Sequence, residues 1–292
     1  MYNFPINYDE PLFRPPSEGR SLIIQVTLGC SWNKCAFCEM YTTKQFKVRK
    51  EEDIFNDIHA FKPYANDIRR VFLADGDAVV LSTNKLLKIL TELKNTFPNL
   101  NRISAYASPR NLNDKTESEL KEQKDAGLNL LFVGIESGDN DVLKAVNKGE
   151  TFSTIVSGLN KSKQAGLNSS VMIINGLGGK QFIEQHAINS AKILNETQPK
   201  YASTLVLTAY KGLDLLKSKY LGNFEELSQI EQLKEMQIFI ENTNLEETIF
   251  RSDHVSNHLI LKGILGKDKE SFLQKIEIAI KNPPPRKNIY DI

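Results

Sequence analysis

Short runs rich in β-branched and apolar residues alternate with longer helical patterns along most of the chain. This alternation is typical of successive βα units built around a parallel sheet. It predicts six strands, at 22–27, 70–74, 102–107, 130–135, 170–175 and 204–209. The helices expected between them lie at 51–60, 84–97, 116–126, 141–146 with 153–165, and 183–194. Gly127 and Gly166 each follow an alanine at a predicted helix end, where glycine can close the helix before the next strand.

The chain beyond the sixth strand predicts two further helices, at 224–241 and 267–280, separated by a mostly polar stretch. No internal repeat, low-complexity tract or linker forces a domain boundary. We therefore predict one α/β chain with a partial (β/α)6 barrel over 20–215, an N-terminal lead over 1–19 and a C-terminal helical extension over 216–292.

The balance of charge narrows the possible partners. Thirty-seven basic residues nearly cancel 36 acidic ones in the 292-residue chain, so no broad cationic field exists for a nucleic acid or an anionic membrane. No run of 18 apolar residues occurs, and the amino terminus lacks the pattern of a signal peptide. We expect a cytoplasmic protein with no membrane partner, and we do not expect nucleic acid as a ligand.

The three cysteines form the most specific motif, Cys30-Ser-Trp-Asn-Lys-Cys35-Ala-Phe-Cys38, directly after the first predicted strand. An odd, clustered set of cysteines points to a metal and not to a disulfide framework. Three thiolates can hold three irons of a cubane and leave the fourth iron without a protein ligand. The alternative is a structural zinc site, which needs a fourth ligand such as His254 or His258.

The cysteine loop resembles that of the radical SAM superfamily, whose usual spacing is Cys-x3-Cys-x2-Cys with an aromatic residue before the last cysteine. Phe37 occupies that aromatic position, and one inserted residue lengthens the first arm of the loop. The resemblance implies a barrel of the radical SAM type. It also implies a [4Fe-4S] cluster on Cys30, Cys35 and Cys38, with S-adenosyl-L-methionine (SAM) bound at the open iron.

Two segments after the second and third strands resemble SAM-binding elements of the same superfamily. Asp75-Gly76-Asp77-Ala78 stands where the family has Gly-Gly-Glu-Pro, which implies that Gly76 and Asp77 bind the methionyl amino group. Ser108 stands where a hydroxyl reaches the SAM ribose. The alternative is that both segments are ordinary turns after the strands.

Two glycine-bearing segments follow the fourth and fifth strands. Gly134-Ile135-Glu136-Ser137-Gly138 resembles the corresponding segment of anaerobic coproporphyrinogen oxidase-like proteins, which implies that Glu136 and Ser137 face SAM. A surface loop with a helix cap at Ser137 or Asp139 is the alternative. In the segment Ile174–Gly179, Gly176 and Gly178 resemble the family's glycine-bearing motif that approaches the adenine of SAM. A flexible loop is the alternative.

The function that the resemblance implies is reductive cleavage of SAM to a 5′-deoxyadenosyl radical, an oxidoreductase chemistry that needs an electron donor such as flavodoxin or ferredoxin. A small molecule or a peptide is the expected substrate, and the sequence assigns no catalytic residue beyond the cofactor sites. Two alternatives remain open: a noncatalytic cluster-binding chaperone, such as a haem-handling one, and a zinc-stabilised β/α enzyme. Among the histidines, His59 and His186 are expected to be solvated or packed on helices.

Overall fold

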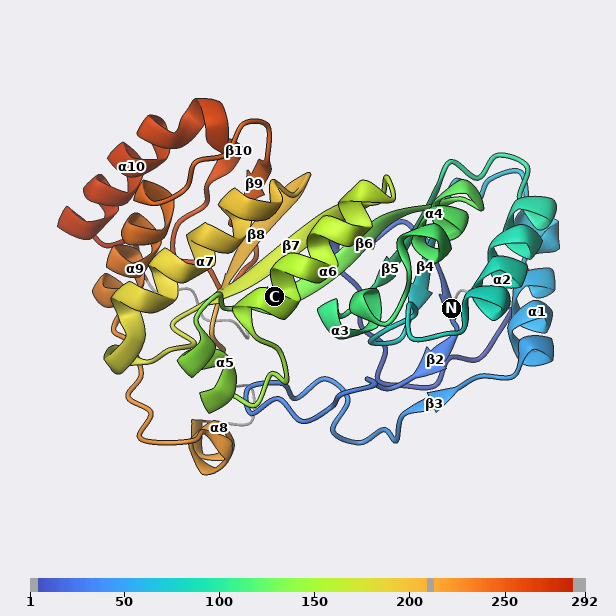
Figure 1. Cartoon of the computed structure of the whole chain (residues 1–292), viewed down its shortest axis with the longest axis horizontal. Helices are drawn as coiled ribbons and strands as arrows, with labels where there is room; N and C mark the ends of the chain where they lie inside the picture. Colours follow the sequence, from blue (N-terminus) through green and yellow to red (C-terminus); the bar gives the residue numbers. More distant parts are fainter. Residues whose placement is uncertain (1–4, 209–212, 286–292) are drawn as a thin grey trace. The chain divides into compact units, whose positions relative to one another are not determined.

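The computed structural model of the protein describes residues 5–208 and 213–285 (Figure 1). The predicted strand at 204–209 therefore ends on a residue outside the described ones. The first four residues of the predicted lead and the last seven of the predicted extension also lie outside them.

The main sheet has eight strands in the order β1-β4-β5-β6-β7-β8-β9-β10 and is mostly parallel, which confirms the predicted α/β class. All six predicted strands are present, and the added strand β10 runs antiparallel to β9. A separate antiparallel pair is formed by β2 and β3. The bounds are β1 (Leu22–Gln25), β2 (Thr27–Leu28), β3 (Lys47–Val48), β4 (Arg70–Ala74), β5 (Arg102–Tyr106), β6 (Leu128–Glu136), β7 (Asn168–Asn175), β8 (Tyr201–Val206), β9 (Ile249–Arg251) and β10 (Lys262–Ile264).

The chain divides into two compact units, one of residues 1–33, 40–133 and 160–169, the other of 34–39, 134–159 and 170–292. In the first unit, β1, β4, β5 and β6 pair in parallel, and α1 and α2 lie side by side (Figure 1). Both helices bury apolar residues, such as Ile54, Ile58, Leu86 and Leu90. The helices that begin in this unit are η1 (Pro16–Glu18), α1 (Glu51–Ala60), η2 (Lys62–Tyr64), α2 (Thr83–Thr96), α3 (Pro109–Asn113) and α4 (Glu117–Asp125).

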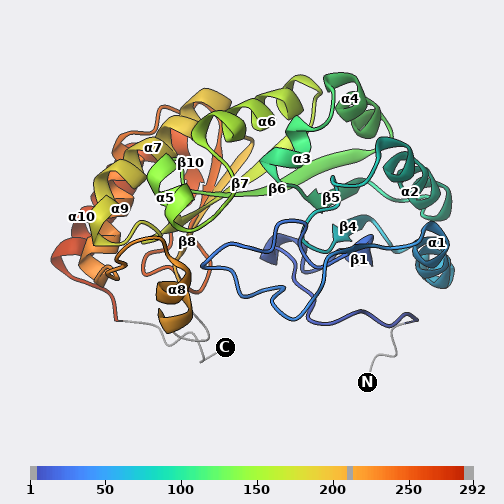
Figure 2. The ribbon, with the colours of Figure 1, turned by 60° about the horizontal axis from the view of Figure 1, so that its bottom comes forward.

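In the second unit β7, β8 and β9 pair in parallel. Helix α9 packs against both α7 and α10 (Figure 2). The predicted helix at 224–241 begins only at Gln229, because the Ser228 side chain caps it there in a capping box with Glu231. The helices that begin in this unit are α5 (Asn140–Ala145), α6 (Phe152–Gln164), η3 (Lys180–Phe182), α7 (Ile183–Thr197), α8 (Leu213–Lys219), α9 (Gln229–Glu241) and α10 (Leu265–Lys281).

No helix within the described ranges is both long and apolar enough to cross a membrane.

The predicted boundaries of the barrel, after residues 19 and 215, stay predictions.

Candidate functional site

The predicted site residues follow the carboxyl ends of strands, which is where parallel α/β folds place their ligands. The first unit carries Cys30, Gly76, Asp77 and Ser108. The second unit carries Cys35, Phe37, Cys38, Glu136, Ser137, Gly176 and Gly178.

Asp75 ties the end of β4 to the residue before the first cysteine. Its buried carboxylate pairs with Lys44 Nζ at 2.9 Å and accepts the Gly29 N–H at 2.9 Å. The next residue, Gly76, donates its N–H to the Gly29 carbonyl at 3.0 Å. A Cβ atom on Gly76 would lie only 2.9 Å from Cys30 Cβ, so a side chain there would displace the first cysteine. The structure thus gives Gly76 a close-approach role beside Cys30.

Asp77 is a buried carboxylate, 1% exposed, and not part of a surface turn. Ser31 Oγ donates to its Oδ2 at 3.3 Å and the Asn111 side-chain amide donates to the same oxygen. Its other oxygen, Oδ1, has no hydrogen-bond partner among the described residues. Burial raises the pKa of Asp77 from 3.8 to about 6, although the neighbouring Ser108, Asn111 and Ser31 side chains lower it.

Ser108 caps the short helix α3, where its Oγ accepts the Asn111 N–H at 3.3 Å. Neither α3 nor the Asn111 contact was predicted from the sequence. The signal was available, because serine followed by proline is a common start of a helix. The cap places the Asn111 side chain against Asp77. On the same helix, the Arg110 guanidinium lies 4.1 Å from the centre of the Trp32 ring in the cysteine loop.

The stretch Lys34–Glu39 is anchored in the second unit. The Ala36 N–H donates to the Val146 carbonyl at 2.8 Å, and Ala36 is buried in an apolar cluster with Val142 and Leu177. Phe37 packs against the same cluster. All three cysteines are partly exposed. Within residues 5–208 and 213–285, no three His, Cys, Asp or Glu side chains already form a group that could hold a metal ion, and cluster ligation stays a prediction.

Glu136 lies at the end of β6 in a strained turn. The Ser137 N–H donates to the Ile135 carbonyl at 2.8 Å, and Glu136 between them has φ 66°. A γ-turn with positive φ at its central residue is rare, and such a conformation costs about 1 to 3 kcal/mol. Gly134 leaves space for the carboxylate, since a Cβ there would lie 2.1 Å from Glu136 Oε1.

The Glu136 carboxylate is only partly satisfied. Its Oε1 pairs with Lys148 Nζ at 3.0 Å, whereas Oε2 is buried with no hydrogen-bond partner in the described part of the chain. Lys148 Nζ also lies 6.0 Å from the centre of the Phe37 ring. The same ammonium group therefore links Glu136, which is predicted to bind SAM, to Phe37, the aromatic residue of the predicted cluster loop. No role for Lys148 was predicted from the sequence.

Ser137 is fully buried and its hydroxyl is already engaged. Its Oγ accepts the Asp139 N–H at 3.0 Å and lies 2.8 Å from His186 Nδ1. The cap of α5 is Asp139, whose Oδ1 accepts the N–H groups of Asp141 and Val142. A direct contact of Ser137 with SAM stays a prediction.

The glycine segment after β7 is packed and hydrogen-bonded. Gly176 has φ 83° and donates its N–H to Glu235 Oε2 at 2.6 Å. Burial raises the pKa of Glu235 to about 8, so this carboxyl is mostly protonated at neutral pH. A Cβ on Gly178 would lie 2.9 Å from Phe182 Cβ. Nothing in the sequence indicated that Glu235, 59 residues away from Gly176, holds this segment.

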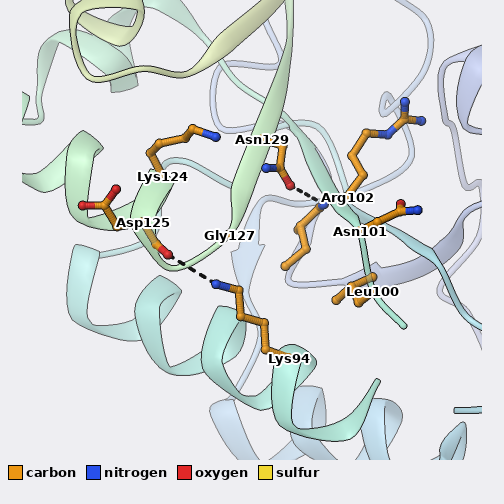
Figure 3. Close-up of a pocket in the computed structure, with 9 residues that line it drawn as sticks. Lys94, Leu100, Asn101, Arg102, Lys124, Asp125, Gly127 and Asn129 are labelled. Atoms are coloured by element: carbon orange, nitrogen blue, oxygen red, sulfur yellow. Dashed lines mark hydrogen bonds between the residues drawn. The ribbon is translucent and has the colours of Figure 1, made fainter. Parts of the chain in front are cut away.

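A cavity of about 270 Å³ lies at the opposite, amino ends of β5 and β6 in the first unit (Figure 3). Lys94 Nζ donates to the Asp125 carbonyl there, and Arg102 extends away to pair with buried Glu18 at 2.8 Å. This cavity takes no part in the candidate site.

The two histidines considered as zinc ligands make hydrogen bonds in the second unit. His254 Nδ1 lies 2.8 Å from Ser256 Oγ, and His258 Nε2 lies 2.6 Å from Gln232 Oε1. Burial lowers the pKa of His254. His258 thus contacts helix α9, and the His254 contact lies within its own loop.

Comparison with known proteins gives a family match over residues 24–189, to the model described as the radical SAM superfamily. The heme chaperone HemW of Bacillus subtilis is 24% identical over 179 residues, covering 61% of this chain and 46% of that protein. Bacteriochlorophyllide d C-8(2)-methyltransferase of Chlorobaculum tepidum is 31% identical over 164 residues, covering 51% of this chain and 34% of that one. The chain thus spans less than half the length of these two relatives.

Two solved structures show the same fold. Coproporphyrinogen III oxidase HemN from Escherichia coli aligns with a TM-score of 0.59 at 19% identity, over 76% of this chain and 51% of that one. Methylornithine synthase PylB aligns with a TM-score of 0.53 at 16% identity, over 91% and 83%. The predicted resemblance to a coproporphyrinogen oxidase-like core is confirmed.

Proposed function

Because the chain belongs to the radical SAM superfamily, we propose that it binds a [4Fe-4S] cluster through Cys30, Cys35 and Cys38 and reductively cleaves SAM. The cofactors of this superfamily are a [4Fe-4S] cluster and SAM. Three thiols with no fourth cysteine in the chain suit a cubane with one open iron. The close approach that Gly76 allows to Cys30 is the backbone feature expected of a residue beside such a cluster.

One observation carries the SAM assignment. Asp77 lies three residues after the end of β4, and Glu136 is the last residue of β6. Both side chains are buried, and each keeps one carboxylate oxygen without a hydrogen-bond partner among the described residues. An unsatisfied buried carboxylate costs free energy and therefore needs an explanation. A bound hydrogen-bond donor explains each of these two oxygens.

The other candidate residues have proposed roles at different parts of SAM and at the cluster. Asp77, beside Gly76, accepts a hydrogen bond from the methionyl ammonium of SAM, and the Ser108 hydroxyl faces the ribose. Glu136 and Ser137 face the ribose and methionyl ends, with Lys148 holding one oxygen of Glu136 in place. Gly176 and Gly178 let the chain approach the adenine, and Phe37 lies beside the cluster.

The cofactors supply the difficult chemistry when bound, namely one-electron cleavage of SAM to a 5′-deoxyadenosyl radical that removes a hydrogen atom from the substrate. The protein residues bind and orient SAM and keep water from the site. A small molecule or peptide is the proposed substrate, and flavodoxin or ferredoxin the proposed class of electron donor.

A noncatalytic haem-handling role is the second candidate, supported by the similarity to the heme chaperone HemW. Membership of the superfamily leaves the zinc-stabilised β/α enzyme of another class without support.

Anaerobic reconstitution followed by a SAM-cleavage assay tests the proposal. We expect about four iron and four sulfide per chain, and release of 5′-deoxyadenosine with a chemical reductant. Cluster formation with haem binding and no 5′-deoxyadenosine would favour the chaperone role. Tight zinc without iron–sulfur absorption would contradict both.

A further inference from the structure

One face of helix α7 holds the turn that contains Glu136. Ser190 Oγ accepts the Gly138 N–H at 2.9 Å, and Asn189 donates to Asp139 Oδ2 at 2.7 Å. Gly138 lies directly on the helix backbone, since a Cβ there would be 2.1 Å from the Asn189 carbonyl oxygen. Residues 186, 189 and 190 share this face because helical positions three and four apart lie next to one another.

His186 is the residue of this face that reaches both predicted SAM-binding segments. Its Nδ1 lies 2.8 Å from Ser137 Oγ, and its Nε2 lies 3.1 Å from the Ile174 carbonyl. A Cβ on Gly178 would also lie 3.5 Å from His186 Cβ. The buried imidazole therefore contacts the residue after Glu136 and the strand end before Gly176, and the Cβ atom of the same histidine lies close to Gly178.

The chemistry of these partners fixes the direction of both hydrogen bonds. A carbonyl oxygen only accepts, so Nε2 carries the ring proton and donates to Ile174. Nδ1 is then the acceptor, and the Ser137 hydroxyl donates to it. Burial lowers the pKa of His186 to about 4, so the ring is neutral and keeps this tautomer at physiological pH.

We propose that His186 is a positioning residue that holds the strained Glu136 turn and the Gly176–Gly178 segment in one arrangement competent to bind SAM. The inference rests on the proposed function. A positive φ at Glu136 persists only where surrounding contacts hold it, and the hydroxyl of Ser137 is the side-chain anchor next to it. Without that anchor the turn relaxes and the carboxylate loses the direction that SAM requires.

Two substitutions separate the two hydrogen bonds of His186. His186→Asn keeps an acceptor near the position of Nδ1, so it retains the bond from Ser137 and loses the one to Ile174. His186→Gln keeps a donor near the position of Nε2, so it retains the Ile174 bond and removes the acceptor of the Ser137 hydroxyl. We expect His186→Gln to weaken SAM binding about tenfold and His186→Asn to weaken it by no more than about threefold. Glu196→Ala, at an exposed position on the same helix, is the matched control.

SAM affinity is measured by titration of the reconstituted protein, together with iron content and melting temperature. A residue that acts through Glu136 gives non-additive effects with it. His186→Gln should therefore cause little further loss of SAM affinity in a Glu136→Gln background. If His186→Gln does not fold, Ser137→Ala removes the same hydrogen bond from its other end.

The outcomes separate this inference from the proposed function. Suppose that Glu136→Gln weakens SAM binding. The positioning role is then wrong, and the proposed function stands, if His186→Gln and Ser137→Ala bind SAM as the wild type does. The same holds if their losses of SAM affinity add fully to that of Glu136→Gln. If both His186 variants lose melting temperature equally with unchanged SAM affinity, the histidine only fills the core and the inference is again wrong. If the wild-type protein binds no SAM, both fail.

Discussion

Replacing Asp77 with asparagine should make the SAM-free protein more stable and its SAM complex weaker. The folded protein holds this carboxyl fully buried, with a pKa raised from 3.8 to about 6. Asparagine removes the buried charge. Its amide oxygen can still accept from Ser31 and Asn111, and its NH2 group would take the place of Oδ1, which has no partner among the described residues.

The magnitude follows from the pKa. The unfolded chain ionises Asp77 near 3.8, whereas the folded chain keeps the proton until about 6, so the free energy of unfolding falls as pH rises through this window and stays lowered above it. Each pKa unit corresponds to about 1.36 kcal/mol, which gives at most about 3 kcal/mol at pH 7.5. Asp77→Asn should raise the free energy of unfolding by up to that amount above pH 6 and change it little near pH 4.

The binding effect has the opposite sign. Loss of a charge-assisted bond to the methionyl ammonium costs on the order of 2 kcal/mol, which is more than about tenfold in SAM affinity. Asp77→Glu keeps the carboxylate and should be tolerated.

Denaturant unfolding at pH 7.5 and near pH 4 measures the first effect, and SAM titration followed by the cluster EPR signal measures the second. Asp67→Asn, at an exposed position of the same unit, should change neither quantity. Wild-type SAM affinity in Asp77→Asn would eliminate the ammonium-binding role. A destabilised Asp77→Asn at pH 7.5 would refute the reasoning from burial.

Three further predictions address the cluster, the second carboxylate and the turn. Replacing all three cysteines with alanine should abolish reconstitution of about four iron and four sulfide, and iron bound at wild-type stoichiometry would rule out this ligand set. Glu136→Gln should weaken SAM binding about tenfold with iron content unchanged, because it removes the charge paired with Lys148; equal affinity would remove Glu136 from the site. Gly138→Ala should lower the unfolding free energy by about 2 kcal/mol or more, because the new Cβ collides with the Asn189 carbonyl; an unchanged melting temperature would contradict the packing.

Periodicity alone was enough to predict the main elements of the fold. The helix predicted at 51–60 coincides with α1, and each predicted strand is present within a few residues. The failures are short elements. Strands β9 and β10 have three residues each, which is too few for a pattern of alternation, and they exist because β9 pairs with β8 and β10 with β9. Helix α3 has five residues and shows only its Ser-Pro start in the sequence.

The sequence by itself determined which residue types stand after each strand, and the motifs among them carry the resemblance to the superfamily. These motifs could be predicted to form a site because a parallel sheet places successive carboxyl ends on one edge. Only the tertiary structure decided how those residues are held. His186 reaches Ser137 from 49 residues away, and Asn111 reaches Asp77 from 34. Hydrogen-bonded side chains so distant in sequence leave no periodic signal, since their pairing is set by the packing of whole elements. That packing also decided the pKa of Asp77, which depends on burial, a property that no local motif specifies.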